Sequence, residues 1–190
     1  MNNTGQLIDD LESRLKNEPN DVEVLLKLAA AFKNGGDYEK AKACYHRLTE
    51  LDDSNSGAWL HLGSTEYNLR HFAEAEKCFV KVIRGGDQSG WPWLRLGDTY
   101  RAKNQPAEAM KSYVRAADIE GTANWAMLSL GDLFRQEDLT KAREYYRQAL
   151  QIAPDFGCAI AAMADILLEQ EQKWEYPCLQ FTLSCKLGSV

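Results

Sequence analysis

The sequence has little of what β-sheets, membrane spans or disulfide frameworks require. Only 19 of its 190 residues are valine, isoleucine or threonine, whereas 45 are leucine or alanine, and β-branched side chains are the ones that favour strands. No apolar run approaches the roughly 20 residues that cross a bilayer. The five cysteines include no CxxC pair, which favours reduced, buried thiols over disulfides or a zinc site. These absences favour a helical protein.

Basic residues are also in deficit. The chain has 22 lysines and arginines but 28 aspartates and glutamates, so its formal net charge is −6. Proteins that bind nucleic acids gain much of their affinity from lysine and arginine contacts to phosphates, and we therefore expect no nucleic-acid partner. Residues 1–10 lack the basic and then apolar pattern of a signal peptide. We expect a soluble, cytoplasmic protein that does not bind membranes.

What the sequence does contain is a pattern that repeats every 34 residues. Similar segments begin at Leu25, Trp59, Trp93 and Met127. Apolar residues recur three and four positions apart within each unit, which indicates amphipathic helices, and polar turns divide each unit into two halves. Each unit is therefore predicted to be a hairpin of two helices. The second half of the fourth unit comes one residue early, so we expect its internal turn to be one residue shorter.

The repeat resembles the tetratricopeptide repeat (TPR) family. Seven residues of the third unit match the family's pattern: Trp93, Leu96, Gly97, Tyr100, Ala109, Tyr113 and Ala116. The resemblance implies an all-α fold, a right-handed superhelical solenoid of TPR-type helical hairpins. Its four full repeats would cover about 22–55, 56–89, 90–123 and 124–155. The second unit departs from the pattern at Glu66, where the family prefers an aromatic residue.

The two ends of the chain complete this array. Residues 1–20 are predicted to form a single capping helix, because Leu7, Leu11 and Leu15 are spaced four apart. Residues 156–190 are predicted to form a partial fifth repeat and an irregular apolar tail. The tail is compatible with a capping helix that begins near Pro177 and with a strand.

No pattern in the sequence points to catalysis. The chain has no glycine-rich phosphate loop, and its histidines, His46, His61 and His71, include no i,i+4 metal-binding pair. Cys44 and Cys78 occupy equivalent places of adjacent units and are interpreted as packing residues. We therefore expect no enzyme activity, no catalytic residue, no metal site and no cofactor.

The family resemblance implies a concave face lined by the first helix of each repeat, which repeat proteins use for binding. One row on this face contains Leu26, Leu60, Leu94 and Leu128, and another contains Lys33, Tyr67, Arg101 and Arg135. Tryptophan and arginine are enriched at binding hot spots, so a peptide or protein with apolar anchors and acidic groups is the expected partner. The predicted binding residues are Lys27, Leu60, His61, Tyr67, Trp91, Leu94, Arg95, Arg101, Trp125, Leu128 and Arg135.

Other interpretations stay open. The leucines could contact neighbouring first helices, and Asp98–Arg101 and Asp132–Arg135 could be i,i+3 ion pairs. Binding of a chaperone's C-terminal carboxylate is not expected, because only Arg95 matches the five clamp positions of the TPR proteins that bind such tails. Self-assembly into a homo-oligomeric scaffold through the ends or the apolar tail, or regulation of a separate enzyme, are the alternative functions.

Overall fold

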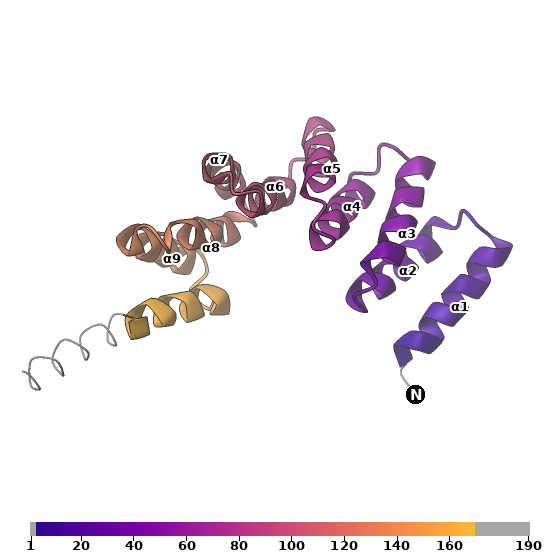
Figure 1. Cartoon of the computed structure of the whole chain (residues 1–190), viewed down its shortest axis with the longest axis horizontal. Coiled ribbons are helices and arrows are strands. Elements are labelled where there is room, and N and C mark those ends of the chain that lie inside the picture. Colours follow the sequence, from indigo (N-terminus) through magenta and orange to yellow (C-terminus); the bar gives the residue numbers. More distant parts are fainter. Residues whose placement is uncertain (1–2, 170–190) are drawn as a thin grey trace, which may run out of the picture. The chain divides into compact units, whose positions relative to one another are not determined.

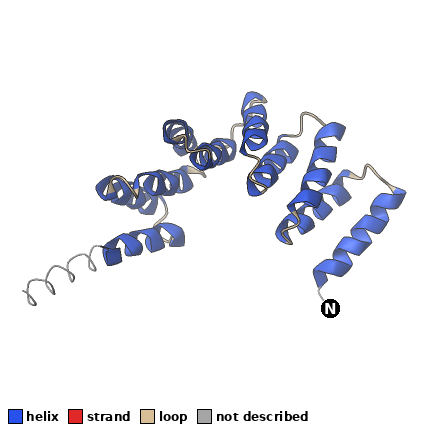
Figure 2. Ribbon diagram, viewed as in Figure 1, coloured by secondary structure: helices blue, strands red, loops and turns tan. Residues whose placement is uncertain are grey.

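Every regular element in residues 3–169, the part of the chain that this computed structural model describes, is a helix (Figures 1 and 2). The chain is an all-α helical-repeat solenoid, as predicted. The two alternatives for the tail after residue 170 lie outside the described residues. The helices are α1 (Asn3–Asn17), α2 (Val22–Asn34), α3 (Tyr38–Leu51), α4 (Ser56–Asn68), α5 (Phe72–Arg84), α6 (Trp91–Ala102), α7 (Pro106–Ala117), α8 (Ala123–Phe134) and α9 (Leu139–Ile152), followed by a helix over residues 157–169.

The chain divides into two compact units, residues 1–119 and residues 120–190. In the first unit, helices α1 to α7 contact one another in chain order, so that the hairpins α2–α3, α4–α5 and α6–α7 stack (Figure 1). In the second unit, α8 and α9 pair as the fourth hairpin. Each hairpin corresponds to one 34-residue period of the sequence.

The turn inside each of the first three hairpins contains one residue with left-handed backbone. Gly36, Arg70 and Asn104 are 34 residues apart and have φ angles of 82°, 63° and 58°. In the third hairpin, the backbone N–H of Gln105 donates to the carbonyl oxygen of Tyr100, five residues earlier, at 2.9 Å, which is a common way to end a helix. The fourth hairpin instead bonds Asp138 N–H to the carbonyl of Phe134, four residues earlier, at 2.8 Å. Counted between equivalent residues, the fourth connection is one residue shorter, Phe134 to Asp138 against Tyr100 to Gln105. Because α8 ends earlier than its counterparts, however, four residues separate α8 from α9, against three in each of the other hairpins.

In the second, third and fourth hairpins, the two helices cross at a glycine that faces a buried aromatic ring. A Cβ atom added at Gly97 would lie 2.5 Å from Cε1 of Tyr113, and Gly63 and Gly131 face Phe79 and Tyr146 in the same way. No side chain fits at these glycines without displacing the ring.

In the third and fourth hairpins the tyrosine ring is also held by its hydroxyl group. Tyr113 donates to Oδ1 of Asp98 at 2.9 Å, and Tyr146 donates to Oδ1 of Asp132 at 2.7 Å. The second hairpin has Phe79, which lacks a hydroxyl group, and Ser64 at the place of the aspartate. The Ser64 hydroxyl donates instead to the carbonyl oxygen of Leu60 at 2.9 Å.

Each unit has its own apolar core. In the first unit, Leu11 of α1 is buried against α2 in a cluster that contains Val24, Leu28 and Tyr45. In the second unit, the helix over residues 157–169 contributes Ala162 and Ile166, which pack with Ala142 and Tyr146 of α9.

The departure from the family pattern at Glu66 corresponds to a buried ionic contact. Glu66 is only 5% exposed. Its Oε1 lies 2.9 Å from Nζ of Lys42, and its Oε2 lies 2.8 Å from Nδ1 of His71. The hydrogen bond to Glu66 is the largest of the effects that raise the pKa of the Lys42 amine. Because Lys42 lies on α3 and Glu66 on α4, the pair joins the first hairpin to the second.

We predict that Gly97→Ala lowers the free energy of unfolding by about 1–3 kcal/mol. The new methyl group overlaps the ring of Tyr113, which is fully buried and tethered to Asp98, so it cannot move aside. Gly57→Ala is the control, because Gly57 is exposed and its nearest neighbour, Asn55 Oδ1, is 3.4 Å away. That change is expected to be neutral or to stabilise by up to about 1 kcal/mol. Equal losses for both variants in urea denaturation would contradict a tight crossing.

A second prediction concerns the buried carboxylate. Lys42→Met is expected to lower the free energy of unfolding by about 1–3 kcal/mol, because Glu66 loses a charged hydrogen bond while it stays buried. Lys111→Met is the matched control, since Lys111 and its partner Glu108 are both exposed, and a change of less than about 0.5 kcal/mol is expected there. A double-mutant cycle with Glu66→Gln measures the coupling, and a cycle that closes additively would exclude a stabilising pair.

Candidate functional site

The predicted row of leucines differs strongly in exposure along the chain. Leu26 is 36% exposed, whereas Leu60 is half-buried and packs against the cluster of Ala75, Phe79 and Leu96. Leu94 is only 3% exposed, so the expectation that it presents an apolar anchor to a ligand needs correction: the surrounding chain encloses its side chain. In the second unit, Leu128 packs against the core cluster around Tyr146. Of this row, Leu26 offers the most surface.

The two tryptophans on the same face are more exposed than Leu60, Leu94 and Leu128. Trp91, at the start of α6, is 37% exposed, and Trp125, in the second unit, is 38% exposed. The Trp125 ring meets that of Phe156 edge to face, with centroids 4.7 Å apart. Tyr67 is half-buried and lies against the ring of Phe72 at 5.6 Å.

Several of the predicted basic residues already have acidic neighbours. Lys27 lies 2.6 Å from Glu23, and Asp98 lies 3.3 Å from Arg95 and 3.9 Å from Arg101. The i,i+3 ion pair considered for Asp98 and Arg101 is therefore present. The pair of Lys27 and Glu23 is exposed and contributes little to stability. The side chain of Asp98, in contrast, is only 14% exposed, so Arg95 and Arg101 also compensate a buried carboxylate.

In the second unit, Arg135 binds the last described helix. Its guanidinium lies 2.6 Å from Glu169 and 3.5 Å from Asp165. These contacts, of which the hydrogen bond to Glu169 is the largest effect, raise the pKa of Arg135. The arginine thus helps to hold the helix over residues 157–169 in place.

The charge of Lys33 interacts with basic side chains on the next two first helices of the first unit. Burial, and then the positive charge of Arg95 on α6, lower the pKa of the Lys33 amine on α2. Burial, and then the charge of Lys33, lower the pKa of His61 on α4. The His61 ring stacks on Tyr45 with centroids 5.4 Å apart. We call Lys33, His61 and Arg95 the basic cluster.

The sequence points to only part of this cluster. His61 and Arg95 are among the predicted binding residues, but Lys33 appears only as a member of its row. Lys33 and Arg95 are 62 positions apart, and nothing in the pattern separates Lys33 from the other lysines. Only the packing of the repeats brings its charge near Arg95.

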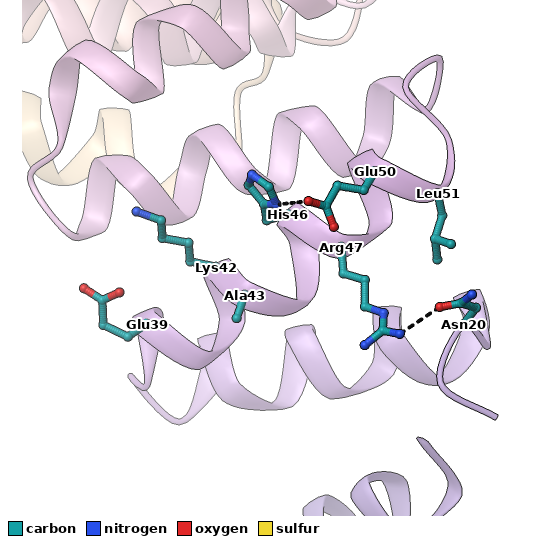
Figure 3. A pocket seen from close by; sticks show the side chains of 8 residues that line it. All are labelled: Asn20, Glu39, Lys42, Ala43, His46, Arg47, Glu50 and Leu51. Atoms are coloured by element: carbon teal, nitrogen blue, oxygen red, sulfur yellow. Dashed lines mark hydrogen bonds and ion pairs between the residues drawn. The ribbon is translucent and has the colours of Figure 1, made fainter. Parts of the chain in front are cut away.

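A different hollow lies on α3, on the second helix of the first repeat (Figure 3). It is lined by residues such as Lys42, His46 and Arg47, together with Asn20. Its polar groups are largely satisfied by each other or by the core: His46 lies 3.2 Å from Glu50, Arg47 donates to Asn20 at 2.8 Å, and Lys42 pairs with buried Glu66.

Among residues 3–169 no group of three or more histidine, cysteine, aspartate or glutamate side chains is placed to hold a metal ion. Burial is the main cause that raises the pKa of Cys78 to about 12, so this thiol stays protonated and is a poor nucleophile. No helix in the described part of the chain has the length and apolarity to cross a membrane.

Solved structures with the same fold are similar to this chain. TTC0263, a thermophilic TPR protein of Thermus thermophilus, is 21% identical and superimposes with a TM-score of 0.72 over 85% of this chain and 89% of that one. MamA from Desulfovibrio magneticus RS-1, residues 41 to the end, is 19% identical with a TM-score of 0.70, over 81% of this chain and 88% of that one. YrrB, described as a TPR protein with an unusual peptide-binding site, is 20% identical with a TM-score of 0.60, over 85% of this chain and 84% of that one.

A comparison of the sequence with curated proteins finds no match, but family models do match it. Three family models, each described as tetratricopeptide repeat, match residues 23–54, 56–84 and 94–155. These spans contain most of the residues from α2 to α9, whose helices pair as the hairpins described above. The chain belongs to the tetratricopeptide repeat family.

Proposed function

We propose that this chain is a non-catalytic protein-interaction module, and that the first helices of its first unit bind a peptide or protein segment with acidic groups. The observation that carries the proposal is the basic cluster. Lys33, His61 and Arg95 come from α2, α4 and α6, so a ligand that meets all three spans three repeats.

The electrostatics of the cluster favour an anionic ligand. Water is partly excluded from Lys33 and His61, and neighbouring positive charges disfavour their charged forms. A carboxylate placed among them would reverse both effects, since an opposite charge stabilises the protonated amine and imidazole. Binding of an acidic group would therefore raise both pKa values towards their ordinary range.

Apolar contacts must add to this attraction. Charged hydrogen bonds contribute about 1.5–3 kcal/mol each, and ordering a flexible segment costs about 2–5 kcal/mol. On this face of the first unit, Leu26 and Trp91 expose apolar surface, and a buried anchor contributes about 1.5–3 kcal/mol. Micromolar affinity is the expected outcome for a flexible peptide.

Self-assembly is the second candidate function, and one observation favours it. Three apolar residues on the helix over residues 157–169, Ile160, Leu167 and Leu168, are 46–56% exposed, and such surfaces often mark association sites. Light scattering on the full chain, run beside the binding assay, separates the two candidates, because only self-assembly gives a molar mass that rises with concentration.

We predict that neutralising the basic cluster weakens the binding of acidic peptides. Short synthetic peptides that carry glutamates and a leucine anchor serve as probes for the full chain. Lys33→Gln or Arg95→Gln is expected to weaken binding by about tenfold, the effect of one lost charged hydrogen bond. Lys111→Gln removes an exposed lysine of α7 and should leave the affinity unchanged. If Lys33→Gln and Arg95→Gln bind as tightly as the original chain, the ligand does not use this cluster.

Leu26 and Leu94, two members of the leucine row, are expected to behave differently. Leu94→Ala should lower the free energy of unfolding by about 2–5 kcal/mol, because it leaves a cavity at a buried site. Leu26→Ala, at an exposed site, should change it by less than about 0.5 kcal/mol while weakening peptide binding. Urea denaturation and titration calorimetry measure the two effects. A stable Leu94→Ala variant would return Leu94 to the set of ligand contacts.

A further inference from the structure

A second groove in the first unit lies outside the face formed by the predicted binding rows. Its volume is about 1020 Å³, and its lining comes from the turn at Asp53 and Ser54, from Trp59 and its neighbours on α4, from α5 and from Tyr100 of α6. None of its lining residues belongs to those rows. We call it the α5 groove.

The floor of the α5 groove is aromatic and held in place. Trp59 is half-buried, and its indole N–H donates to the carbonyl oxygen of Asp53 at 3.0 Å. The hydroxyl group of Tyr100 donates to Oε1 of Glu76 at 3.1 Å. Val80, which is also half-buried, lines the groove together with these two rings. Because both rings are already oriented by hydrogen bonds, an apolar side chain can pack on them with little further ordering.

The lining of the groove contains three basic side chains and two acidic ones, Asp53 and Glu76, so basic charge is in excess although the chain as a whole is acidic. Lys77, Lys81 and Arg84 follow one another at four- and three-residue spacing on α5, so they share one face of the helix. The Nζ atom of Lys81 lies 4.7 Å from the centre of the Trp59 ring. This stripe of cations borders the aromatic floor directly.

The ion pairs on the rim are ones that a ligand can replace. Lys81 lies 2.6 Å from Oδ2 of Asp53, but the two side chains are 41% and 72% exposed. Lys77 lies 2.7 Å from Glu74, with both side chains more than half exposed. Exposed pairs of this kind contribute little to stability. A ligand carboxylate that takes the place of Asp53 on Lys81 therefore displaces a weak contact and keeps the lysine paired.

We propose that the α5 groove binds a segment of a partner protein in which an aliphatic or aromatic anchor is flanked by carboxylates. The anchor packs on Trp59 and Val80, and the carboxylates bind Lys81 and its neighbours on α5. Complementarity between this basic rim and the acidic flanks selects the partner. The first unit then presents two separate binding faces, and this site does not depend on the basic cluster.

The test uses the indole N–H signals of the full-length, ¹⁵N-labelled chain, with the Trp59 signal assigned by Trp59→Phe. The probes are two synthetic peptides with the same leucine anchor, one flanked by glutamates and the other by lysines, together with inorganic phosphate. The glutamate peptide is expected to shift the Trp59 signal, whereas the lysine peptide and phosphate are not. Lys81→Glu should weaken the glutamate peptide by about tenfold and allow the lysine peptide to bind.

Two variants guard against indirect effects. Lys111→Glu makes the same charge reversal on α7. Like Lys77, this lysine has a glutamate partner three residues earlier, and its reversal should leave the affinity for both peptides unchanged. Lys77→Glu, at a side chain that is 71% exposed, repeats the reversal in the groove should Lys81→Glu fail to fold.

Several outcomes would overturn the proposal. Equal shifts with both peptides would show that charge does not select the ligand, and an equal shift with phosphate would show that the apolar anchor plays no part. A shift at Trp91 without one at Trp59 would place the peptide on the first-helix face, supporting the function proposed above and not this groove. A molar mass that rises with concentration and falls with Lys81→Glu would make a second copy of the chain the occupant.

Discussion

The close crossing of two helices at a glycine is the contact on which the second, third and fourth hairpins depend. Gly63, Gly97 and Gly131 face rings that fill the space a Cβ would need. The thickness of an aromatic ring therefore sets how near the two backbones lie. The distance between the two helices of a hairpin also affects how the next hairpin packs on it. The same crossing therefore determines which side chains of the first helices remain at the surface and which are enclosed.

Much of the fold could be predicted because it depends on local and periodic properties. Apolar spacing identifies the helices, and a constant period of 34 residues pairs them. The missing residue of the fourth repeat could also be predicted, since the second half of that repeat comes one residue early, whereas the early end of α8 at Phe134 could not. The left-handed residues at Arg70 and Asn104 are different. Asparagine adopts that conformation more readily than most residues other than glycine, but arginine has no such preference, so only the equivalence of Arg70 to Gly36 accounts for its backbone.

The candidate sites could be predicted less well, because they depend on what surrounds each residue. Leu26 and Leu94 occupy the same place of their repeats, yet one is exposed and the other enclosed. Lys33 gains its interest from its burial and then from the charge of Arg95 two repeats later, neither of which the repeat pattern shows. The α5 groove joins a turn, a second helix and a residue of the next repeat, so no single helix pattern contains it.

The ion pair between Lys42 and Glu66 has a consequence for the dynamics of the array. In repeat proteins a hairpin is stabilised mainly by its neighbours, so terminal hairpins tend to peel away first. Here a carboxylate buried between the first two hairpins would lose a cationic partner if they separated. The amino-terminal hairpin is therefore expected to open together with the second, as one cooperative unit, instead of fraying alone.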